Sequence, residues 1–296
     1  MAQASRRLTM AQWDVFSSKP LEGNSLAVFF DGGGLTDGEM QSIAKEMNLS
    51  ETTFILPSHG AKVEDAVRVR IFTVQEELPF AGHPTLGTAF ALRGQSGAKK
   101  IVLELNVGQV PVTFEDGAGK PAFGEMTQVD PAFVMRHERE AVAKATGLRA
   151  EDFDDSLPIE TISTGVPFTV TPLKSLAVIE KLQVDLNRAA EYLSKTAGKF
   201  FYFVTRETVD PEARLHSRML FYNGEDPATG SAAGCTAAWM VAHGVAEPDE
   251  RVLIEQGVEM KRASRIFVRA SRSDNRVVNV RVGGNSVEIM RGEVFL

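Results

Sequence analysis

The sequence predicts an α+β fold of two similar halves, each with a mixed sheet wrapped around one buried helix. Three observations predict it. Strand-like patterns outnumber helical ones and do not alternate strictly with them. Two helix-forming segments are apolar all round, which is typical of helices buried on every side. These two segments also resemble each other, and 296 residues are enough for two modest domains.

The elements of the first half follow from local patterns. Residues 35–50 predict a helix, because Thr36 and Glu39 fit a capping box and apolar residues then recur at helical spacing. Residues 66–73 alternate apolar and charged side chains, as a half-buried strand does. Further strands are predicted within 14–30, where the ordered pattern begins near Trp13, and at 51–57, 101–105 and 110–114.

The second half repeats this mixture. Amphipathic helices are predicted at 137–147 and 186–198. Strands are predicted at 200–205, 218–222, 251–257, 265–271, 276–282 and 285–290. The weakly patterned, proline-containing residues 119–133 are where we expect the boundary between the halves.

The two apolar helices begin with matching motifs. "ELPFAGHPTLG" starts at Glu77 and "EDPATGSAAG" starts at Glu225, and their Glu, Pro and Gly residues align without gaps. Equal spacing in each half favours an internal duplication over coincidence. The N-terminus of a helix carries free N–H groups and the positive end of the dipole. If the halves face each other, both ends point into one cleft that suits a substrate carboxylate.

Composition excludes several classes of protein. The net charge is −7 and no basic block is present, so nucleic-acid binding is not expected. Cys235 is the single cysteine, which excludes an internal disulfide and disfavours a cysteine zinc site. The N-terminus lacks the apolar core of a secretion signal, and no stretch matches a membrane span. We therefore expect a soluble, cytoplasmic protein that does not bind membranes.

Four side chains near the helix starts are candidates for chemistry. Glu51 stands between a polar helix end and an apolar strand, and His83 follows Gly82. Asp226 and Ser231 flank the start of the second apolar helix. Each has a structural alternative: Glu51 as a solvated acid, His83 and Asp226 as helix caps, Ser231 as a small packing residue. The remaining histidines lie in polar or turn contexts and are expected at the surface: His59, His137, His216 and His243.

Other catalytic motifs do not fit. "GEDPATGS" lacks the lysine of a phosphate loop, and no G-x-G-x-x-G, G-x-S-x-G or zinc-ligand pair occurs. We therefore expect a site without metal or cofactor. A glutamate desolvated in a closed cleft can reach a pKa of about 6–7 and move protons as both acid and base.

Several stretches together resemble the phenazine-biosynthesis PhzF-like isomerases, which share the diaminopimelate-epimerase fold. They include "NLSETTFIL", "ELPFAGHPTLGTAFAL", "STGVPF", "GEDPATGSAAG" and the late "EQG", in family order over nearly the full length. The resemblance implies barrel-like halves, a last strand that returns to the first half, and a homodimer. The halves are then 1–128 with about 286–296, and 129–285. One departure is Ser25, where the family usually has proline.

The resemblance also implies roles for individual residues. Glu51 looks like the family's acid/base carboxylate, assisted by His83 and Asp226. The expected substrate-binding residues are Asn24, Ser50, Gly82, Thr229, Gly230 and Ser231. The expected reaction moves a proton on a small carboxylic acid such as a dihydro-hydroxyanthranilate, in phenazine biosynthesis or elsewhere.

Two other classes of function stay open. One is a one-carboxylate epimerase or a lyase acting on an amino or hydroxy acid. The other is a non-catalytic metabolite-binding or interaction protein, because fold and motif do not fix function. A two-cysteine epimerase is disfavoured on chemical grounds, since it needs one thiol on each face of an α-carbon and this chain has only Cys235.

Overall fold

The computed structural model describes residues 6–57, 66–117, 119, 121–221 and 224–296. The chain forms two compact units, which we call the first unit and the second unit. The first comprises Met1–Met126 with Gly283–Leu296, and the second comprises Thr127–Val282. Within the described residues, no helix has the length and apolar character needed to cross a membrane.

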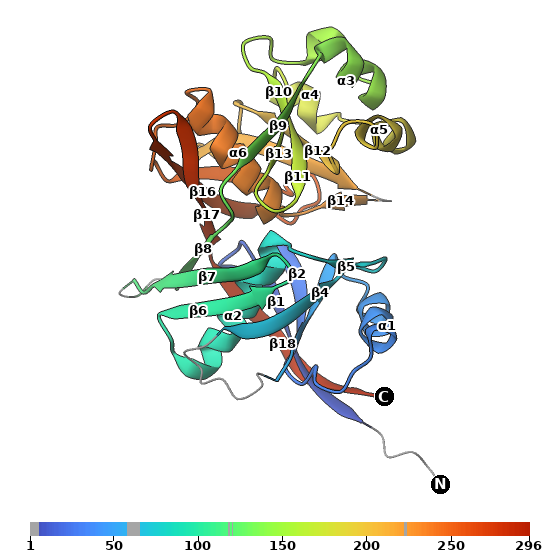
Figure 1. Ribbon diagram of the computed structural model, residues 1–296, viewed down its shortest axis with the longest axis vertical. Coiled ribbons are helices and arrows are strands. Elements are labelled where there is room, and N and C mark those ends of the chain that lie inside the picture. The colour runs from blue at the N-terminus through green and yellow to red at the C-terminus, as the bar shows by residue number, and fades with distance from the viewer. Residues whose placement is uncertain (1–5, 58–65, 118, 120, 222–223) are drawn as a thin grey trace. The chain divides into compact units, whose positions relative to one another are not determined.

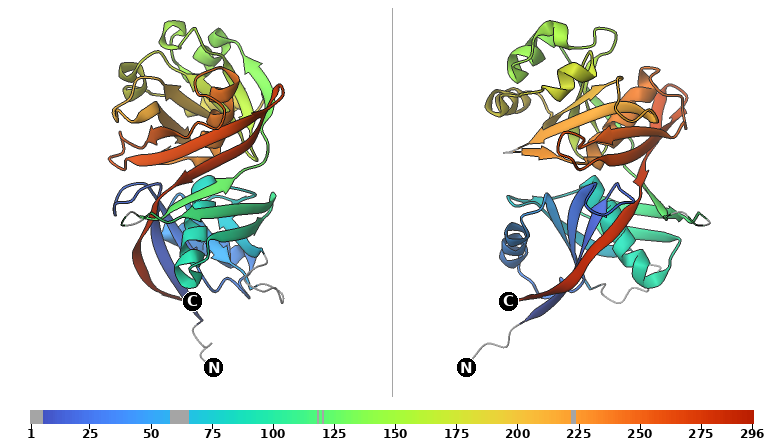
Figure 2. Two further views of the ribbon diagram at one scale, coloured as in Figure 1. Left: turned by 90° about the vertical axis from the view of Figure 1, so that its left-hand side faces the viewer. Right: turned by 180° about the vertical axis from the view of Figure 1, so that it is seen from behind.

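Among its described residues, the first unit has two helices and more residues in strands than in helices (Figure 1). The helices are α1 (Asp37–Met47) and α2 (Gly82–Ser96), and the strands are β1 (Arg7–Val15), β2 (Asn24–Phe29), β3 (Glu51–Ile55), β4 (Val67–Phe72), β5 (Glu77–Leu78), β6 (Lys100–Leu105), β7 (Gly108–Glu115), β8 (Phe123–Thr127) and β18 (Ser286–Phe295). β1 begins well before Trp13, the expected start of ordered structure, because it pairs along its length with the distant β18 (Figure 2).

The second unit has more helices, all of them short except the last. They are α3 (Arg139–Thr146), a 3-10 turn at Ala150–Asp152, α4 (Leu176–Glu180), α5 (Leu186–Leu193) and α6 (Gly230–Ala242). The strands are β9 (Ala132–His137), β10 (Ile159–Ser163), β11 (Pro167–Pro172), β12 (Phe200–Thr205), β13 (Ala213–Phe221), β14 (Gly224–Asp226), β15 (Val252–Gln256), β16 (Ser264–Ser273) and β17 (Arg276–Gly284).

The strands of the two units pair in the same order. In the first, β2 is parallel to β3, β3 antiparallel to β4, β4 parallel to β6, and β6 antiparallel to β7. In the second, the same sequence of orientations runs through β11, β12, β13, β15 and β16. The short strands β5 and β14 pair antiparallel with β4 and β13 and lead into α2 and α6. This shared topology supports the internal duplication.

A repeated ion pair strengthens the correspondence. Arg70 of β4 donates to both carboxylate oxygens of Glu77 in β5, at 2.8 and 2.5 Å. Arg218 of β13 does the same to Glu225 in β14, at 2.8 and 2.7 Å. Bidentate pairs of this kind fix geometry as well as charge. Both units therefore anchor the short strand before the central helix in the same way.

The two central helices are buried, as the sequence predicts. In α2 the buried residues run from Gly82 to Ala91, and in α6 from Gly230 to Val241. A Cβ on Gly87 of α2 would lie 2.6 Å from the Leu26 side chain and 2.7 Å from that of Val15. Helix and sheet are thus in closer contact than any side chain at position 87 would allow.

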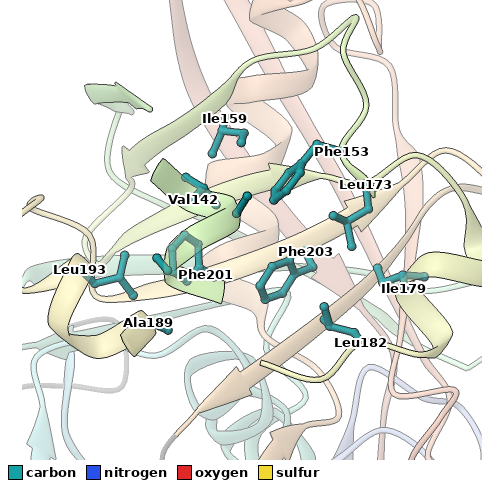
Figure 3. Packing of buried hydrophobic residues seen from close by; sticks show 12 residues of the cluster. Val142, Phe153, Ile159, Leu173, Ile179, Leu182, Ala189, Leu193, Phe201 and Phe203 are labelled. Carbon is teal, nitrogen blue, oxygen red and sulfur yellow. The ribbon is translucent and has the colours of Figure 1, made fainter. Parts of the chain in front are cut away.

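The remaining helices cover the outside of the sheets. In the first unit, α1 begins with the predicted capping box, in which Thr36 and Glu39 bond each other's backbone N–H groups. In the second unit, α3, α4 and α5 cover a separate core built around Phe201 and Phe203 of β12 (Figure 3). The central helices are therefore enclosed by sheet, and the amphipathic ones lie against its outer face.

Candidate functional site

The first unit brings three of the expected site residues together. Glu51 is the first residue of β3 and pairs in register with Leu26 of the parallel β2. Asn24 is the first residue of β2, and His83 is the second residue of α2. Asn24 and His83 are almost fully buried, while the Glu51 side chain keeps 13% of its surface exposed. A carboxylate at a strand start thus meets an imidazole at a helix start.

The His83 ring lies between the amide of Asn24 and the carboxylate of Glu51. Its Nδ1 is 3.1 Å from Asn24 Nδ2, and its Nε2 is 3.5 Å from Glu51 Oε2. Burial lowers the pKa of His83 to about 3, although a hydrogen bond with the Ser25 backbone opposes this shift. The imidazole is therefore neutral at neutral pH.

The start of α2 keeps its backbone donors. Its N-cap residue is Ala81, and no side chain caps the helix. His83 is therefore not a cap, which removes the structural alternative considered for it. Gly82 is buried at the first helical position, and Ser50 lies half-buried directly before Glu51. The expected backbone donors are thus available next to the Glu51 and His83 side chains.

A buried aspartate that the sequence analysis missed organises the turn before Asn24. Asp14 is fully buried in β1, and its Oδ2 accepts a hydrogen bond from the Leu21 N–H at 2.7 Å. The Ser25 hydroxyl donates to Asp14 Oδ1 at 3.0 Å. Proline, which the family resemblance leads us to expect at position 25, has no side-chain donor for this bond. The departure at Ser25 therefore adds a contact that stabilises the turn.

The second unit brings Asp226 and Thr229 together. Asp226 ends β14, and Thr229 is the N-cap residue of α6 without capping the helix through its side chain. The Thr229 hydroxyl donates to Asp226 Oδ2 at 2.5 Å, and both side chains are buried. Asp226 is therefore not the helix cap that was considered as its structural alternative. Its carboxylate is held at the mouth of the helix by the hydroxyl of Thr229.

The first turn of α6 packs closely on a buried glutamine. Gly230 and Ser231 are both buried. Gln128 donates from Nε2 to the Gly230 carbonyl at 3.1 Å and accepts from the Thr164 hydroxyl at 2.6 Å. No side chain caps α6, so its first N–H groups remain available, as in α2. Each unit therefore presents an uncapped helix start beside a carboxylate.

The expectation that the other histidines lie at the surface is wrong for two of them. His137 is buried, with its ring nitrogens 2.8 Å from the Tyr192 hydroxyl and 2.7 Å from that of Thr161. His216 is fully buried between two carboxylates. His243 is half-buried and 2.6 Å from Glu160, and His59 lies outside the described residues. Their partners are distant in sequence, so local polarity was a poor guide.

The burial of His216 predicts a pH-dependent stability. Its ring lies 2.8 Å from Glu255 and 2.9 Å from Glu259. Burial disfavours the charged ring, but the hydrogen bonds to both carboxylates outweigh it and raise the pKa of His216 to about 9. This stabilisation is fully present below the unfolded-state pKa of about 6.5. It is lost as the pH rises through the folded-state pKa, so the free energy of unfolding should fall by about 1–3 kcal/mol between pH 6.5 and 10.

Urea unfolding followed by Trp239 fluorescence, in a Trp13→Phe background, measures this in the second unit. His216→Gln should be less stable at pH 6 and should lack most of the decline. A decline of equal size in both proteins would show that His216 does not cause it.

Cys235 is a packing residue with an inert thiol. It is fully buried in α6, 3.5 Å from the Thr164 hydroxyl and 3.6 Å from the Val166 carbonyl. Burial raises the pKa of its thiol to about 11. The thiolate, which is the reactive form, is thus scarce at neutral pH.

We expect the native protein to resist thiol reagents at pH 8 and Cys235→Ala to keep its activity. Denatured protein, which should release one reactive thiol, is the control. Rapid labelling of the native protein, or an inactive Cys235→Ala, would contradict this assignment.

The described residues therefore form two groups, one in each unit. Glu51, His83 and Asn24 lie together in the first, and Asp226, Thr229 and Ser231 lie around the start of α6 in the second. Among the described residues, no cluster of three or more His, Cys, Asp or Glu side chains could hold a metal ion.

Comparison with known proteins gives a consistent result. The model of the family described as "Phenazine biosynthesis-like protein" matches residues 13–292. The chain is 38% identical over 286 residues to a trans-2,3-dihydro-3-hydroxyanthranilate isomerase of Pseudomonas chlororaphis, covering 96% of this chain and 98% of the relative. It is 37% identical over 298 residues to an uncharacterized isomerase of Mesorhizobium japonicum, covering 96% and 97%.

Solved structures agree on the fold. The crystal structure of a PhzF-family phenazine biosynthesis protein from Bacillus anthracis matches with a TM-score of 0.86 at 27% identity, covering 98% of this chain and 100% of that one. A probable proline racemase from Agrobacterium radiobacter matches with a TM-score of 0.67, covering 97% and 92%. Its 12% identity shows a shared fold only. These neighbours confirm the predicted α+β, diaminopimelate-epimerase-like fold.

Proposed function

Because this chain belongs to the phenazine biosynthesis-like (PhzF) family and is an isomerase, we propose that it moves a proton on a small carboxylic acid by Glu51 acid/base catalysis. The observation that supports this most directly is the contact between the Glu51 carboxylate and the neutral His83 ring, 3.5 Å apart at the start of α2. A partly exposed carboxylate next to a buried neutral imidazole suits repeated uptake and release of one proton.

In the proposed reaction, Glu51 removes a proton from one carbon of the conjugated substrate. The electron pair of that C–H bond shifts the double bond, and the proton returns from Glu51 to a second carbon. The formula of the substrate is unchanged, so no oxidant, reductant or cofactor takes part. His83, fixed by Asn24, orients the Glu51 carboxylate.

In this proposal the residues around the start of α6, Asp226, Thr229 and Ser231, orient the substrate. Asp226, held by Thr229, would accept a hydrogen bond from an amino or hydroxyl group of the substrate. Each unit has an uncapped helix start, with Ser50 nearby in the first and Ser231 in the second, whose N–H groups suit a carboxylate such as that of the substrate. A dihydro-hydroxyanthranilate carries all of these groups, and it is the compound named for the relative in Pseudomonas chlororaphis.

Proton NMR of the wild-type protein in D₂O tests the reaction class. The compounds are a trans-2,3-dihydro-3-hydroxyanthranilate and simple amino and hydroxy acids. A shifted ring double bond supports the proposal. Exchange confined to an α-carbon would make the protein an epimerase, and elimination products a lyase. Binding without any exchange would indicate a metabolite-binding protein and overturn the proposal.

The same family membership supports a homodimer in the cytoplasm as part of the proposal. Sedimentation equilibrium of the purified chain distinguishes a dimer from the 32.2 kDa monomer. A monomer at micromolar concentration would contradict the dimer without affecting the assignment of Glu51.

A further inference from the structure

One fully buried glutamine makes four hydrogen bonds directly behind Asp226 and Thr229. Gln256 is the last residue of β15 and belongs to the "EQG" stretch. Its Nε2 donates to the Asp226 carbonyl at 2.7 Å and to the Thr229 hydroxyl oxygen at 2.9 Å. Its Oε1 accepts from the Thr229 N–H at 3.0 Å and lies 2.9 Å from the Tyr202 hydroxyl. Both donors and both acceptor positions of the amide are therefore used.

These contacts determine the direction of the hydrogen bonds that reach Asp226. Since the backbone N–H of Thr229 can only donate, the oxygen of the Gln256 amide must face it, and the nitrogen must face the Thr229 hydroxyl. That hydroxyl then accepts a hydrogen bond from Gln256 and has its own proton to donate. The acceptor within reach is Asp226 Oδ2, at 2.5 Å. The chain of bonds runs from Gln256 through Thr229 to Asp226.

Gln256 is itself held by its surroundings. The Tyr202 hydroxyl lies 2.8 Å from Ser217 Oγ, which itself lies 2.9 Å from the Glu255 carbonyl oxygen. Tyr202 is fully buried, and burial raises the pKa of its phenol, so the group stays neutral. Rigidly packed supporting groups of this kind are what hold a functional side chain in one geometry.

The charged groups on the neighbouring strands are paired away from Gln256. β13 carries His216, which lies between Glu255 and Glu259, and Arg218, which is paired with Glu225 of β14. The Gln256 amide is thus a neutral group between these ion pairs and the start of α6. The first unit has no glutamine at the position that corresponds to Gln256. In the second unit Gln256 lies two residues after Ile254, which pairs with Leu215. In the first unit the residue two after Leu103, which pairs with Val67, is Leu105.

We propose that Gln256 is a positioning residue for the reaction: it fixes the Asp226–Thr229 segment and directs the Thr229 hydroxyl toward the Asp226 carboxylate. The inference rests on the proposed function, in which Asp226 orients the substrate, but its structural part can be measured without turnover. Gln256 does not touch substrate in this account and acts through Thr229 and Asp226.

Gln256→Glu and Gln256→Met test the proposal. Glutamate has the same shape, but it can donate only when protonated. Burial beside Asp226 raises the pKa of a carboxyl group at this position. Gln256→Glu should therefore be active at low pH and lose activity about tenfold per pH unit above its own apparent pKa. The pH dependence of wild-type activity should not show this decline. Gln256→Met, which cannot hydrogen-bond in this way at any pH, should be at least tenfold slower throughout.

Tyr202→Phe is the matched control, because it removes one contact to Oε1 and leaves both Gln256 donors in place. It should keep the wild-type pH profile, with activity within about threefold. If Gln256→Glu and Gln256→Met both follow the wild-type profile, reduced only by a constant factor, Gln256 has a general packing role and the proposal is wrong.

NMR of the protein without substrate tests the positioning role of Gln256 without a measurement of activity. In Gln256→Met, the Thr229 amide should exchange with solvent at least tenfold faster and the ¹³Cγ titration of Asp226 should move upward, while Tyr202→Phe leaves both unchanged. If the wild type turns over no compound, the proposed function fails and these two signals decide the positioning claim. Unchanged signals in Gln256→Met would overturn it.

Discussion

Glu51→Gln is expected to lower kcat by about 10²–10⁴-fold, the usual contribution of a general acid–base group. Glutamine keeps the shape of the side chain and its position at the start of β3, but it cannot accept and return a proton. Because glutamine has nearly the same size and shape, and the Glu51 side chain keeps 13% of its surface exposed, we expect the melting temperature to stay within a few degrees of the wild type. The measurement is steady-state isomerisation together with calorimetry on the same samples.

Glu46→Gln is the matched control for this loss. Glu46 is an exposed glutamate on α1, in the same unit and nearby in sequence. Its substitution makes the same change of charge without touching the His83 group, so activity should remain within about twofold. An active Glu51→Gln would remove Glu51 from the mechanism. Equal losses in both variants would point to a general effect of charge.

Gly257→Ala should cause the largest loss of stability among the substitutions considered. Gly257 follows Gln256 and has a φ of +75°, where an alanine costs roughly 1–2 kcal/mol. A Cβ there would lie 2.5 Å from the Arg262 carbonyl oxygen and 2.6 Å from that of Pro227, both of them backbone atoms. Overpacking adds about 1–3 kcal/mol. The combined loss of about 2–5 kcal/mol should lower the melting temperature by roughly 5–15 °C.

Gly244→Ala separates the two causes of this loss. Gly244 has nearly the same φ, +69°, but no atom lies within 4 Å of a Cβ built on it. Its substitution should therefore cost only the backbone strain, about 1–2 kcal/mol. Gly257→Ala should also reduce activity, because relief of the contact with Pro227 displaces the segment that carries Asp226. Equal destabilisation by both substitutions would show that the close contact at Gly257 has no energetic weight.

The sequence predicts those features that depend on nearby residues. The capping box at Thr36 and Glu39 is local, and so is the start of α1. The absence of a polar face predicts the burial of α2 and α6, and the matching motifs at Glu77 and Glu225 predict two similar units. Proximity of Glu51 to His83 is an outcome of the fold, which the family resemblance anticipates and spacing alone does not.

What the sequence could not predict depends on contacts between distant segments. His216 stands in a polar-looking strand, yet its partners Glu255 and Glu259 come about forty residues later. The four bonds of Gln256 reach three other elements. A single signal was available: a glutamine at the end of the apolar strand "VLIEQ" must find hydrogen bonds if it is buried. The sequence therefore indicates that Gln256 needs hydrogen-bond partners, but it does not indicate which residues they are.

The central claim is that Glu51 carries the proton between two carbons of the substrate. The most direct measurement is the deuterium content of each product carbon after reaction in D₂O, with wild type and Glu51→Gln followed side by side by NMR. The account predicts a shifted double bond in the wild type, with deuterium at the newly protonated ring carbon to the extent that the proton on Glu51 exchanges with D₂O before it is delivered, and neither in the variant. The same labelled product from Glu51→Gln at a comparable rate would contradict it.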